Sequence, residues 1–380
     1  MSIPTAPERV YALTNSAAGN AVAVFVRREG GNLIPLTPPP APGLPGPLSA
    51  DGVVRPLPAF PTGGLGAGGP LVSQSALALS QNGQLLFACN PGSNEVTSFL
   101  VTPSGLQFAS RVSSGGVQPV SVTTFGNLVY VVNAVNNLVG TVGLDGPGTG
   151  QIAGFTIGLN GILTPLEDSG RVLSSPFSGP AQVAFNPDGT LLVVTELTAG
   201  RITVFQIEED GRPGTVVENK SAGSAPFGFA FNAAGHLIVS ELGSLTMTNS
   251  SVSSYAVSAS GELTVISTSV PTEQSAACWI VNTPDGRFSY SSNTVSGSLS
   301  GFSVTTGGEL APLTADGRTG ITGTTSLPID MVIGTEGRYL DVLTQGTQTI
   351  MTFQIGSNGC LTPLSSVGNL PPLAVGLALG

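Results

Sequence analysis

The most evident shortage in this sequence is charge. Only 9% of its 380 residues are Asp, Glu, Lys or Arg, against about 25% in typical soluble domains. The 12 basic residues are scattered along the chain, and the net charge is −10. Nucleic-acid binding needs a clustered basic face. We therefore expect no nucleic-acid partner.

Residues that hold metals or form disulfides are also scarce. The chain has one histidine, His236, and three cysteines, Cys89, Cys278 and Cys360. The cysteines are far apart and lack C-x-x-C spacing, so neither a zinc site nor a disulfide framework is indicated. We expect no metal and no cofactor. A Ca²⁺ or Mg²⁺ site built from carboxylate oxygens remains an alternative.

Long hydrophobic runs are absent too. No segment approaches the roughly 20 uninterrupted apolar residues that span a bilayer, so we expect no membrane partner despite a mean hydropathy of +0.31. Residues 1–9 lack the apolar stretch of a signal peptide. This favours the cytoplasm, although the low charge would also suit a secreted protein. We expect a monomer.

The sequence is rich in turn formers, with 52 Gly and 30 Pro, and it repeats one unit seven times. In each copy an apolar strand ends in a polar residue, a second strand ends in Gly, and a short Leu-x-Pro-Leu-like strand follows. From the second copy on, a leading strand and a tight turn come first. Each repeat is thus a four-stranded sheet of about 45–50 residues, the size of a propeller blade. The copies begin at 10–15, 85–90, 129–133, 191–196, 237–241, 288–293 and 339–344.

The first copy lacks its leading strand, and the chain carries a spare one at 371–380. Pairing the two would close a ring and remove two exposed sheet edges, which otherwise invite aggregation. We predict an all-β, seven-bladed β-propeller over residues 1–380 as a single domain, with blade 1 built from 10–36 and 371–380. A β-sandwich or β-helix is the alternative, but neither explains the missing and surplus strands.

Polar residues recur where the second strand of each repeat ends. In a propeller, these ends surround one mouth of the central tunnel, and the inner strands begin there too. The long insertions 37–73, 134–150 and 242–251 fall on the same face, and loops on a rigid scaffold commonly carry function. We therefore expect a small-molecule ligand at this mouth. The candidate residues from the second strands are Asn90, Asn133, Glu196, Glu241 and Asn293, and those from the inner strands are Gln182, Trp279 and Asp330.

Glu196 and Glu241 occupy equivalent places in adjacent blades and are the candidate catalytic pair. Two nearby carboxylates can separate their pKa values, so that one acts as acid and the other as base. The alternative is that each caps a loop by accepting backbone N–H bonds, as the Asn residues of sister blades do. Arg201 could pair with Glu196 or form a surface ion pair.

The other candidates would bind the ligand rather than react with it. Trp279, the only Trp, would provide a stacking floor for a ring, or else would fill the tunnel. Asp330 would be a third acid at the mouth, or would bond a neighbouring strand. Gln182 and Asn133 would orient a carbonyl, beside Asn90 and Asn293.

The repeat pattern, with x-G-x-L-x-P-L followed by P-x-x-x-x-F-x-P-D-G, resembles the lactonase seven-bladed propeller family. This family includes bacterial 6-phosphogluconolactonases and fungal carboxymuconate lactonizing enzymes. The resemblance covers 10–379 and is clearest at 179–211. Family members often carry G-P-R-H at the start of a central inner strand, where Arg and His steady an anionic substrate. This chain has Gly179-Pro180-Ala181-Gln182 there.

Two functions follow as expectations. The resemblance implies an enzyme that opens, closes or isomerises a small cyclic ester, with Glu196 and Glu241 as acid and base. The alternative is a non-catalytic propeller that binds a ligand or a protein through the loops of the same face.

Overall fold

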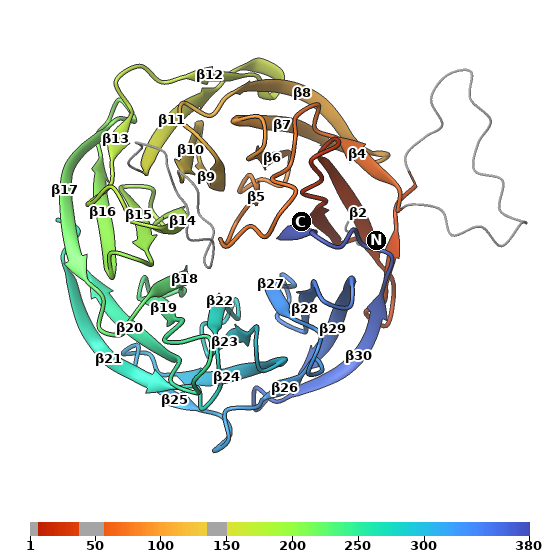
Figure 1. The fold of residues 1–380 in the computed structure, drawn as a ribbon, viewed down its shortest axis with the longest axis vertical. Helices are drawn as coiled ribbons and strands as arrows, with labels where there is room; N and C mark the ends of the chain where they lie inside the picture. The colour runs from red at the N-terminus through yellow and green to blue at the C-terminus, as the bar shows by residue number, and fades with distance from the viewer. Residues whose placement is uncertain (1–6, 38–56, 135–149) are drawn as a thin grey trace, which may run out of the picture.

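The computed structural model describes residues 7–37, 57–134 and 150–380, so residues 38–56 of the predicted insertion 37–73 and residues 135–149 of the predicted insertion 134–150 lie outside the described residues. The described residues form seven antiparallel sheets arranged around an axis (Figure 1). This confirms the predicted all-β, seven-bladed β-propeller. A 3₁₀ turn, η1 (Leu159–Gly161), is the one helical element in the described ranges. No helix there is long and apolar enough to cross a membrane.

Each blade has an inner, a second, a third and an outer strand. In that order, blade 1 contains β31 (Val375–Leu379), β1 (Arg9–Leu13), β2 (Ala21–Arg27) and β3 (Leu33–Pro35). Blades 2 to 4 contain β5 (Leu77–Leu79), β6 (Leu85–Asn90), β7 (Glu95–Thr102) and β8 (Gly105–Ser113); β9 (Pro119–Phe125), β10 (Leu128–Asn133), β11 (Gln151–Ile157) and β12 (Leu163–Pro165); and β14 (Pro180–Phe185), β15 (Leu191–Glu196), β16 (Arg201–Ile207) and β17 (Pro213–Lys220).

Blades 5 to 7 follow the same order, and three short strands extend other blades. Blades 5 to 7 contain β18 (Pro226–Phe231), β19 (Leu237–Glu241), β20 (Ser251–Val257) and β21 (Leu263–Pro271); β22 (Ala277–Asn282), β23 (Phe288–Asn293), β24 (Ser298–Val304) and β25 (Leu310–Pro312); and β27 (Pro328–Ile333), β28 (Tyr339–Thr344), β29 (Thr349–Ile355) and β30 (Leu361–Val367). The short strands β4 (Ala59–Pro61), β13 (Arg171–Val172) and β26 (Gly320–Ile321) pair with the third strands of blades 1, 3 and 6.

The ring closes as the sequence predicts. The last strand, β31, pairs antiparallel with β1, and Val10 lies opposite Leu379. A buried ion cluster ties blade 1 to blade 7, because Arg27 of β2 bonds both Glu8 and Asp341 of β28. The two ends of the ring are therefore joined by the backbone hydrogen bonds between β1 and β31 and by the ion pairs of Arg27.

Burial follows the position of each strand in its blade. The second strand β15 is buried at all six positions, whereas the outer strand β17 is mostly exposed or half-buried. A second strand is packed between neighbouring blades on both faces, so its sequence is continuously apolar (LLVV) rather than alternating. The core thus lies in the inner and second strands.

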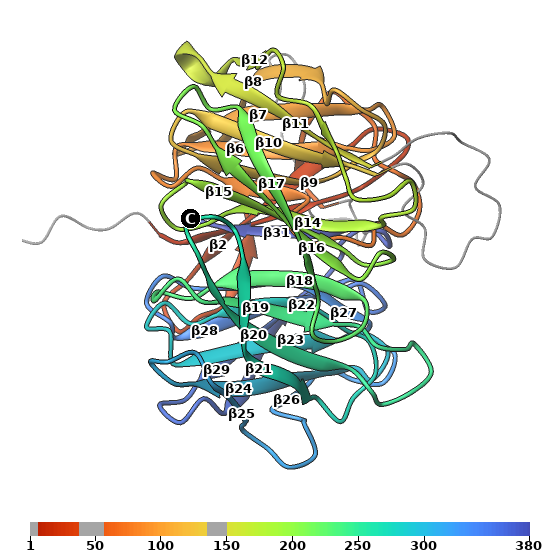
Figure 2. The same cartoon turned by 90° about the vertical axis from the view of Figure 1, so that its left-hand side faces the viewer.

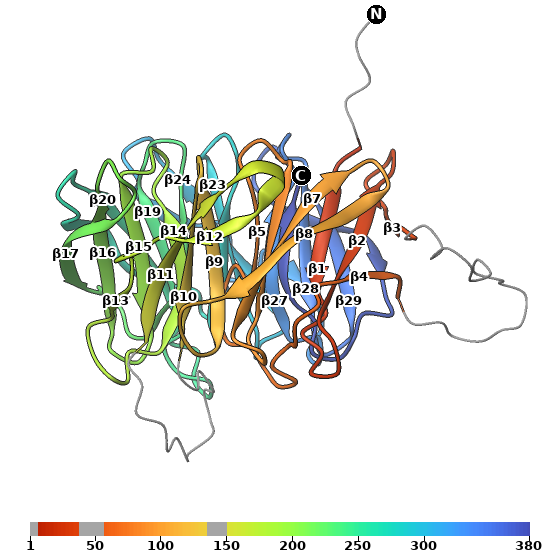
Figure 3. The ribbon, with the colours of Figure 1, turned by 90° about the horizontal axis from the view of Figure 1, so that it is seen from above.

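The disc has two faces, seen edge-on in Figures 2 and 3. We call the side with the second-to-third turns and the connections between blades the loop face. The side with the inner-to-second turns is the turn face, and the C-terminus lies there, on the upper side of Figure 3. The turn after β14 shows why these turns need glycine. Gly189 has φ +76°, and a Cβ there would lie 2.2 Å from the Phe125 ring.

Candidate functional site

The polar residues that end the second strands are buried and bonded to their own surroundings. Asn90 accepts hydrogen bonds from Asn20 Nδ2 and Thr62 Oγ1 at 3.0 and 2.7 Å. Asn133 donates to the carbonyl of Ser114, in the connection between blades 2 and 3. In blade 6, Asn293 donates to two serine hydroxyls of β24, Ser298 and Ser300. The Asn residues at this position of the repeat therefore hold loops and turns of the loop face in place.

Glu196 ends β15 and is completely buried. Its Oε2 accepts hydrogen bonds from the hydroxyl and the backbone N–H of Ser174, at 2.5 and 3.2 Å, and its Oε1 accepts from the hydroxyl of Thr203. Burial raises the pKa of this carboxyl, while the bonds from Ser174 and Thr203 lower it. Its partners come from the connection that precedes blade 4 and from β16.

Glu241 ends β19 and is also completely buried. Its carboxylate accepts from the N–H of Gly223 at 2.7 Å, from the hydroxyl of Ser253 at 2.7 Å, and from the hydroxyl of Ser251. None of these donors is shared with Glu196. Each carboxylate is thus bonded within its own blade and the connection that precedes it.

The axis itself is filled near the loop face. Trp279 of β22 is 4% exposed, and its ring lies 4.8 Å from that of Phe227 with an edge-on geometry. Its indole Nε1 donates to the carbonyl of Ser73 at 2.9 Å. Trp279 is therefore a packed side chain here, held by a segment from the other side of the ring.

That segment, residues 71–76, precedes β5, and we call it the axial segment. Gln74 uses its side-chain amide like a strand backbone, because Nε2 donates to Ile280 O and Oε1 accepts from Ile280 N–H, at 2.9 and 3.1 Å. The backbone N–H of Gln74 donates to Ala181 O, and Ser73 Oγ donates to Val120 O. The axial segment thus joins inner strands of blades 3, 4 and 6 across the axis.

Asp330 of β27 faces the same segment. Its carboxylate accepts from the N–H of Gly376 at 2.6 Å and from the N–H of Ser75. Burial raises its pKa to about 7, and these two N–H bonds oppose that rise. Asp330 therefore titrates near neutrality, between the closing strand and the axial segment.

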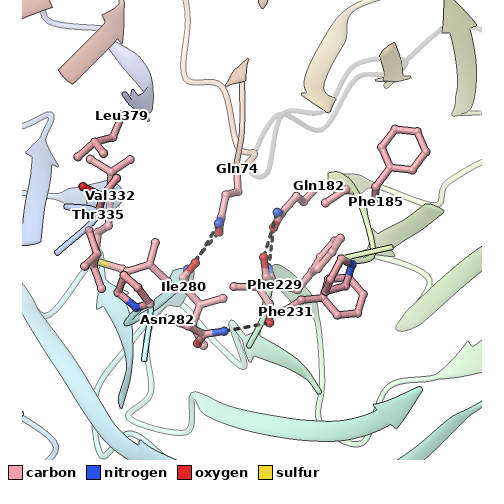
Figure 4. Close-up of a pocket in the computed structure, with 17 residues that line it drawn as sticks. Gln74, Gln182, Phe185, Phe229, Phe231, Ile280, Asn282, Val332, Thr335 and Leu379 are labelled. Carbon is pink, nitrogen blue, oxygen red and sulfur yellow. Dashed lines mark hydrogen bonds between the residues drawn. The ribbon is translucent and has the colours of Figure 1, made fainter. Parts of the chain in front are cut away.

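A cavity of about 730 Å³ opens at the turn-face ends of the inner strands of blades 4 to 7 (Figure 4), and we call it the axial cavity. Gln74 and Gln182 lie in its wall, and Gln182 bonds Phe229 N–H and O at 2.6 and 3.0 Å. None of the described residues that line it is charged. The lining residues are Gln74, Gln182, Ala184, Phe185, Pro187, Phe229, Ala230, Phe231, Ile280, Val281, Asn282, Pro284, Met331, Val332, Ile333, Thr335 and Leu379.

The candidate residues divide between the two faces. Gln182 lines the axial cavity, on the turn-face side of the axial segment. The other candidates lie outside its lining; they are Glu196, Glu241, Trp279, Asp330, Asn90, Asn133 and Asn293. A second hollow, of about 620 Å³, lies on the loop face between blades 4 and 5, lined by 197–201 and 220–225. We call it the loop-face groove.

Two lining residues, Gln74 and Asn282, were missed in the sequence. Gln74 directly follows the Pro/Gly-rich insertion 37–73, where no periodic pattern predicts a conformation, and its partner Ile280 is 206 positions away. Asn282 ends an inner strand, and its only signal was a polar residue directly before the T-P-D-G turn. In the described ranges, no group of three His, Cys, Asp or Glu side chains lies together.

Comparison with known proteins identifies the family. The family described as "Lactonase, 7-bladed beta-propeller" matches residues 166–278 and 246–372, which together span more than half of the chain. No curated protein sequence matches this chain.

Solved structures show the same fold over the whole chain. A candidate 6-phosphogluconolactonase from Bacteroides fragilis has a TM-score of 0.73 and 20% identity, covering 100% of both chains. The periplasmic gluconolactonase of Pseudomonas aeruginosa has a TM-score of 0.68 and 21% identity, covering 97% of this chain and 99% of its own. Identities this low show only that the fold is shared. This shared fold agrees with the family match. The chain belongs to the lactonase family of seven-bladed β-propellers.

Proposed function

We propose that this chain binds a small, uncharged cyclic ester in the axial cavity. The observation that carries the proposal is the uncharged lining of an open cavity formed mainly by the inner strands of blades 4 to 7. Its volume of about 730 Å³ lies within the range of about 300–1,000 Å³ that small-molecule sites occupy. A lactone of one or two rings fits such a space.

The lining favours an unphosphorylated lactone. Phosphate and carboxylate groups are bound by Arg, Lys or clustered backbone N–H groups. At the position where family members often carry Arg and His, this chain has Ala181 and Gln182. The Gln182 amide is already engaged with Phe229 through both of its polar groups. Of the lactones named for the similar structures, the uncharged gluconolactone type suits this cavity better than the phosphorylated type.

Glu196 and Glu241 are, on this proposal, loop supports rather than an acid–base pair. Each is fully buried and accepts at least three hydrogen bonds, and neither lines the axial cavity. Buried carboxylates with several donors act as structural anchors in this way. The catalytic alternative predicts a loss of turnover when either becomes Gln.

A second function is hydrolysis of the bound ester, the activity that the family description names. In the reaction, water adds to the ester carbonyl and the ring C–O bond breaks, so that the product is a hydroxy acid. Asp330 is a buried acid whose pKa is raised to about 7 by burial, but it lies outside the lining of the axial cavity and its carboxylate accepts from Gly376 and Ser75. We therefore give it no part in proton transfer.

The binding proposal is tested by calorimetry with gluconolactone and its phosphorylated counterpart. Ala230→Phe fills the axial cavity, and Ala199→Phe places the same side chain in the loop-face groove as a control. We expect gluconolactone to bind the wild type and Ala199→Phe, but not Ala230→Phe. Equal binding to a folded Ala230→Phe variant, or preference for the phosphorylated lactone, would contradict the proposal.

Hydrolysis is measured by acid release on the same lactone. We expect Asp330→Asn to keep turnover, because Asp330 lies outside the lining of the axial cavity. Glu196→Gln and Glu241→Gln should keep turnover. The loop-support role fails if either Glu variant loses turnover with binding intact, and a loss of turnover in Asp330→Asn would place this acid in the site.

A further inference from the structure

The loop-face groove gathers positive charge on a face that has little charge of either sign. The second-to-third turns of blades 1, 2 and 4 to 7 contain no charged residue. In the lining of the groove, by contrast, the two charged residues are both basic, Arg201 and Lys220. Lys220 is the only lysine of a chain whose net charge is −10. The groove is therefore a positive site on an acidic protein.

The two basic side chains lie close together without an anion that neutralises both. Arg201 begins β16 and Lys220 ends β17, and the two residues are directly opposite in the ladder. Like charges in this arrangement destabilise a sheet. Arg201 Nε lies 3.9 Å from Glu218 Oε2, and these side chains are 43% and 45% exposed, so this ion pair contributes little. The Lys220 side chain has no ion pair or hydrogen bond within the described ranges.

Two further donors belong to the wall of the groove. Ser224 and Ala225 line it, and their backbone N–H groups donate to none of the residues that the structure describes. No acidic side chain is part of the lining. Glu241 lies behind Gly223, but its carboxylate is completely buried and already accepts several hydrogen bonds. A hollow with two cations, free N–H groups and no carboxylate of its own is complementary to an anion.

We propose that the loop-face groove binds a small dicarboxylate, one carboxylate on the Arg201 guanidinium and the other on the Lys220 ammonium. A guanidinium binds a planar carboxylate through two parallel N–H bonds. Two cations are balanced by two negative charges, and the volume of about 620 Å³ is that of a small-molecule site. The groove shares no lining residue with the axial cavity. This second site goes beyond the proposed function and does not depend on it.

Because Lys220 is the only lysine, binding can be measured at the site itself. Reductive methylation with ¹³C-formaldehyde keeps its positive charge and gives one lysine signal in NMR, separate from that of the terminal amine. Succinate and its monomethyl ester are the probes, since they differ by one negative charge and little in shape. We expect succinate to shift the signal saturably and to bind about 5-fold more tightly than the ester. Equal affinity, or a shift that follows ionic strength alone, overturns the proposal without any mutation.

Variants then place the binding in the groove. Arg201→Met should weaken succinate binding about 5-fold, and Ala199→Phe, which fills the groove, should abolish it. Arg28→Met is the matched control, because Arg28 is an exposed basic residue in the turn after β2, and it should leave the affinity unchanged. An equal loss in Arg28→Met and Arg201→Met would mean that net charge, and not the groove, attracts succinate.

The stability of Lys220→Met separates a ligand-binding role from a structural one. Removing one of two opposed cations should leave the melting temperature unchanged or raise it, because the repulsion across the ladder is lost. Residues kept for binding often carry such a cost in stability. A clear fall in melting temperature would show that Lys220 supports the fold, and would overturn its assignment as a ligand-binding residue.

The remaining outcomes distinguish this inference from the proposed function. If Ala230→Phe loses gluconolactone while Ala199→Phe binds succinate like the wild type, the axial cavity stands and the groove is not a site. If succinate behaves as expected while gluconolactone does not bind the wild type, the groove stands and the proposed function fails. If inorganic phosphate binds more tightly than succinate, the dicarboxylate class is wrong.

Discussion

The buried carboxylate of Glu241 is surrounded by donors, and this makes its two possible roles distinguishable. Gly223 N–H and two serine hydroxyls donate to it. In Glu241→Gln, an NH₂ group would face part of this donor set, so one or more donors would lose their acceptor. We expect the free energy of unfolding in urea to fall by about 1–3 kcal/mol.

Glu262→Gln is the matched control, because the Glu262 side chain is exposed in the same blade. It should change stability by less than about 0.5 kcal/mol. A catalytic acid held under strain would give the opposite sign for Glu241→Gln, with unchanged or higher stability. A stable Glu241→Gln protein would therefore count against the loop-support role.

Asp330 gives the protein a pH dependence with a definite sign. In the unfolded chain its carboxyl loses its proton near pH 3.8, whereas in the folded protein the pKa is about 7. Between these values the folded state binds more protons, so this group's contribution to stability falls as pH rises and levels off above about 7. Each pKa unit corresponds to about 1.4 kcal/mol, so the total loss is at most about 4 kcal/mol.

Asp330→Asn should remove this slope, because the amide does not ionise. The measurement is urea unfolding of both proteins near pH 5 and pH 8. We expect the variant to gain stability relative to the wild type at the higher pH. The same difference at both pH values would show that Asp330 does not titrate in this window.

At the scale of the elements, the axial segment holds the side chains that fill the propeller axis near the loop face. Gln74→Ala would leave the Ile280 N–H and carbonyl without their side-chain partner, which costs about 1–3 kcal/mol when such groups stay buried. It would also loosen Ser73, whose carbonyl accepts from the Trp279 indole.

Because Trp279 is the only Trp, tryptophan fluorescence reports on the surroundings of this side chain alone. We expect acrylamide quenching of Trp279 to increase in Gln74→Ala. Gln345→Ala, which removes a longer amide bond to Ala374 O, is the control and should leave quenching unchanged. Unaltered quenching in Gln74→Ala would mean that the axial segment stays in place without the amide.

The strands were predictable from the sequence because their signals are local. The apolar runs 191–196 and 288–293 coincide with β15 and β23, since each ends in a polar residue and follows a turn with glycine. The leading strand of blade 2 was expected from 76 onward, and the structure has only β5 (Leu77–Leu79). The chain before it turns onto the axis, bonding residues that lie far away in the sequence.

The site was harder to predict because its contacts join residues that lie far apart in the sequence. The polar ends of the second strands were expected to surround an open mouth, but the structure buries them against loops and fills the axis with Trp279 and Gln74. The axial cavity lies at the opposite ends of the inner strands, and Gln182 is the predicted residue that lines it. Which end of a tunnel stays open depends on contacts between blades, which no repeat pattern encodes.

For the whole molecule, the closing strand is the decisive element. Deleting residues 370–380 removes β31, so β1 becomes an exposed edge and Asp330 loses the Gly376 N–H. We expect the truncated protein to melt over a broader range and to aggregate. Calorimetry checks this, and a transition as sharp as that of the full chain would contradict ring closure as a requirement for cooperative folding.

The pairing of β1 with β31 also sets how the molecule responds to force. The beginning of β1, at Arg9, lies beside the end of β31, where the backbones of Arg9 and Gly380 bond each other. Tension applied between these two points would load the ladder one hydrogen bond at a time, as in unzipping, and not all of its bonds together, as in shear. A ring that we expect to unfold cooperatively in heat and urea is thus mechanically weak along this one direction, and an optical-tweezers handle at each end would open blade 1 first.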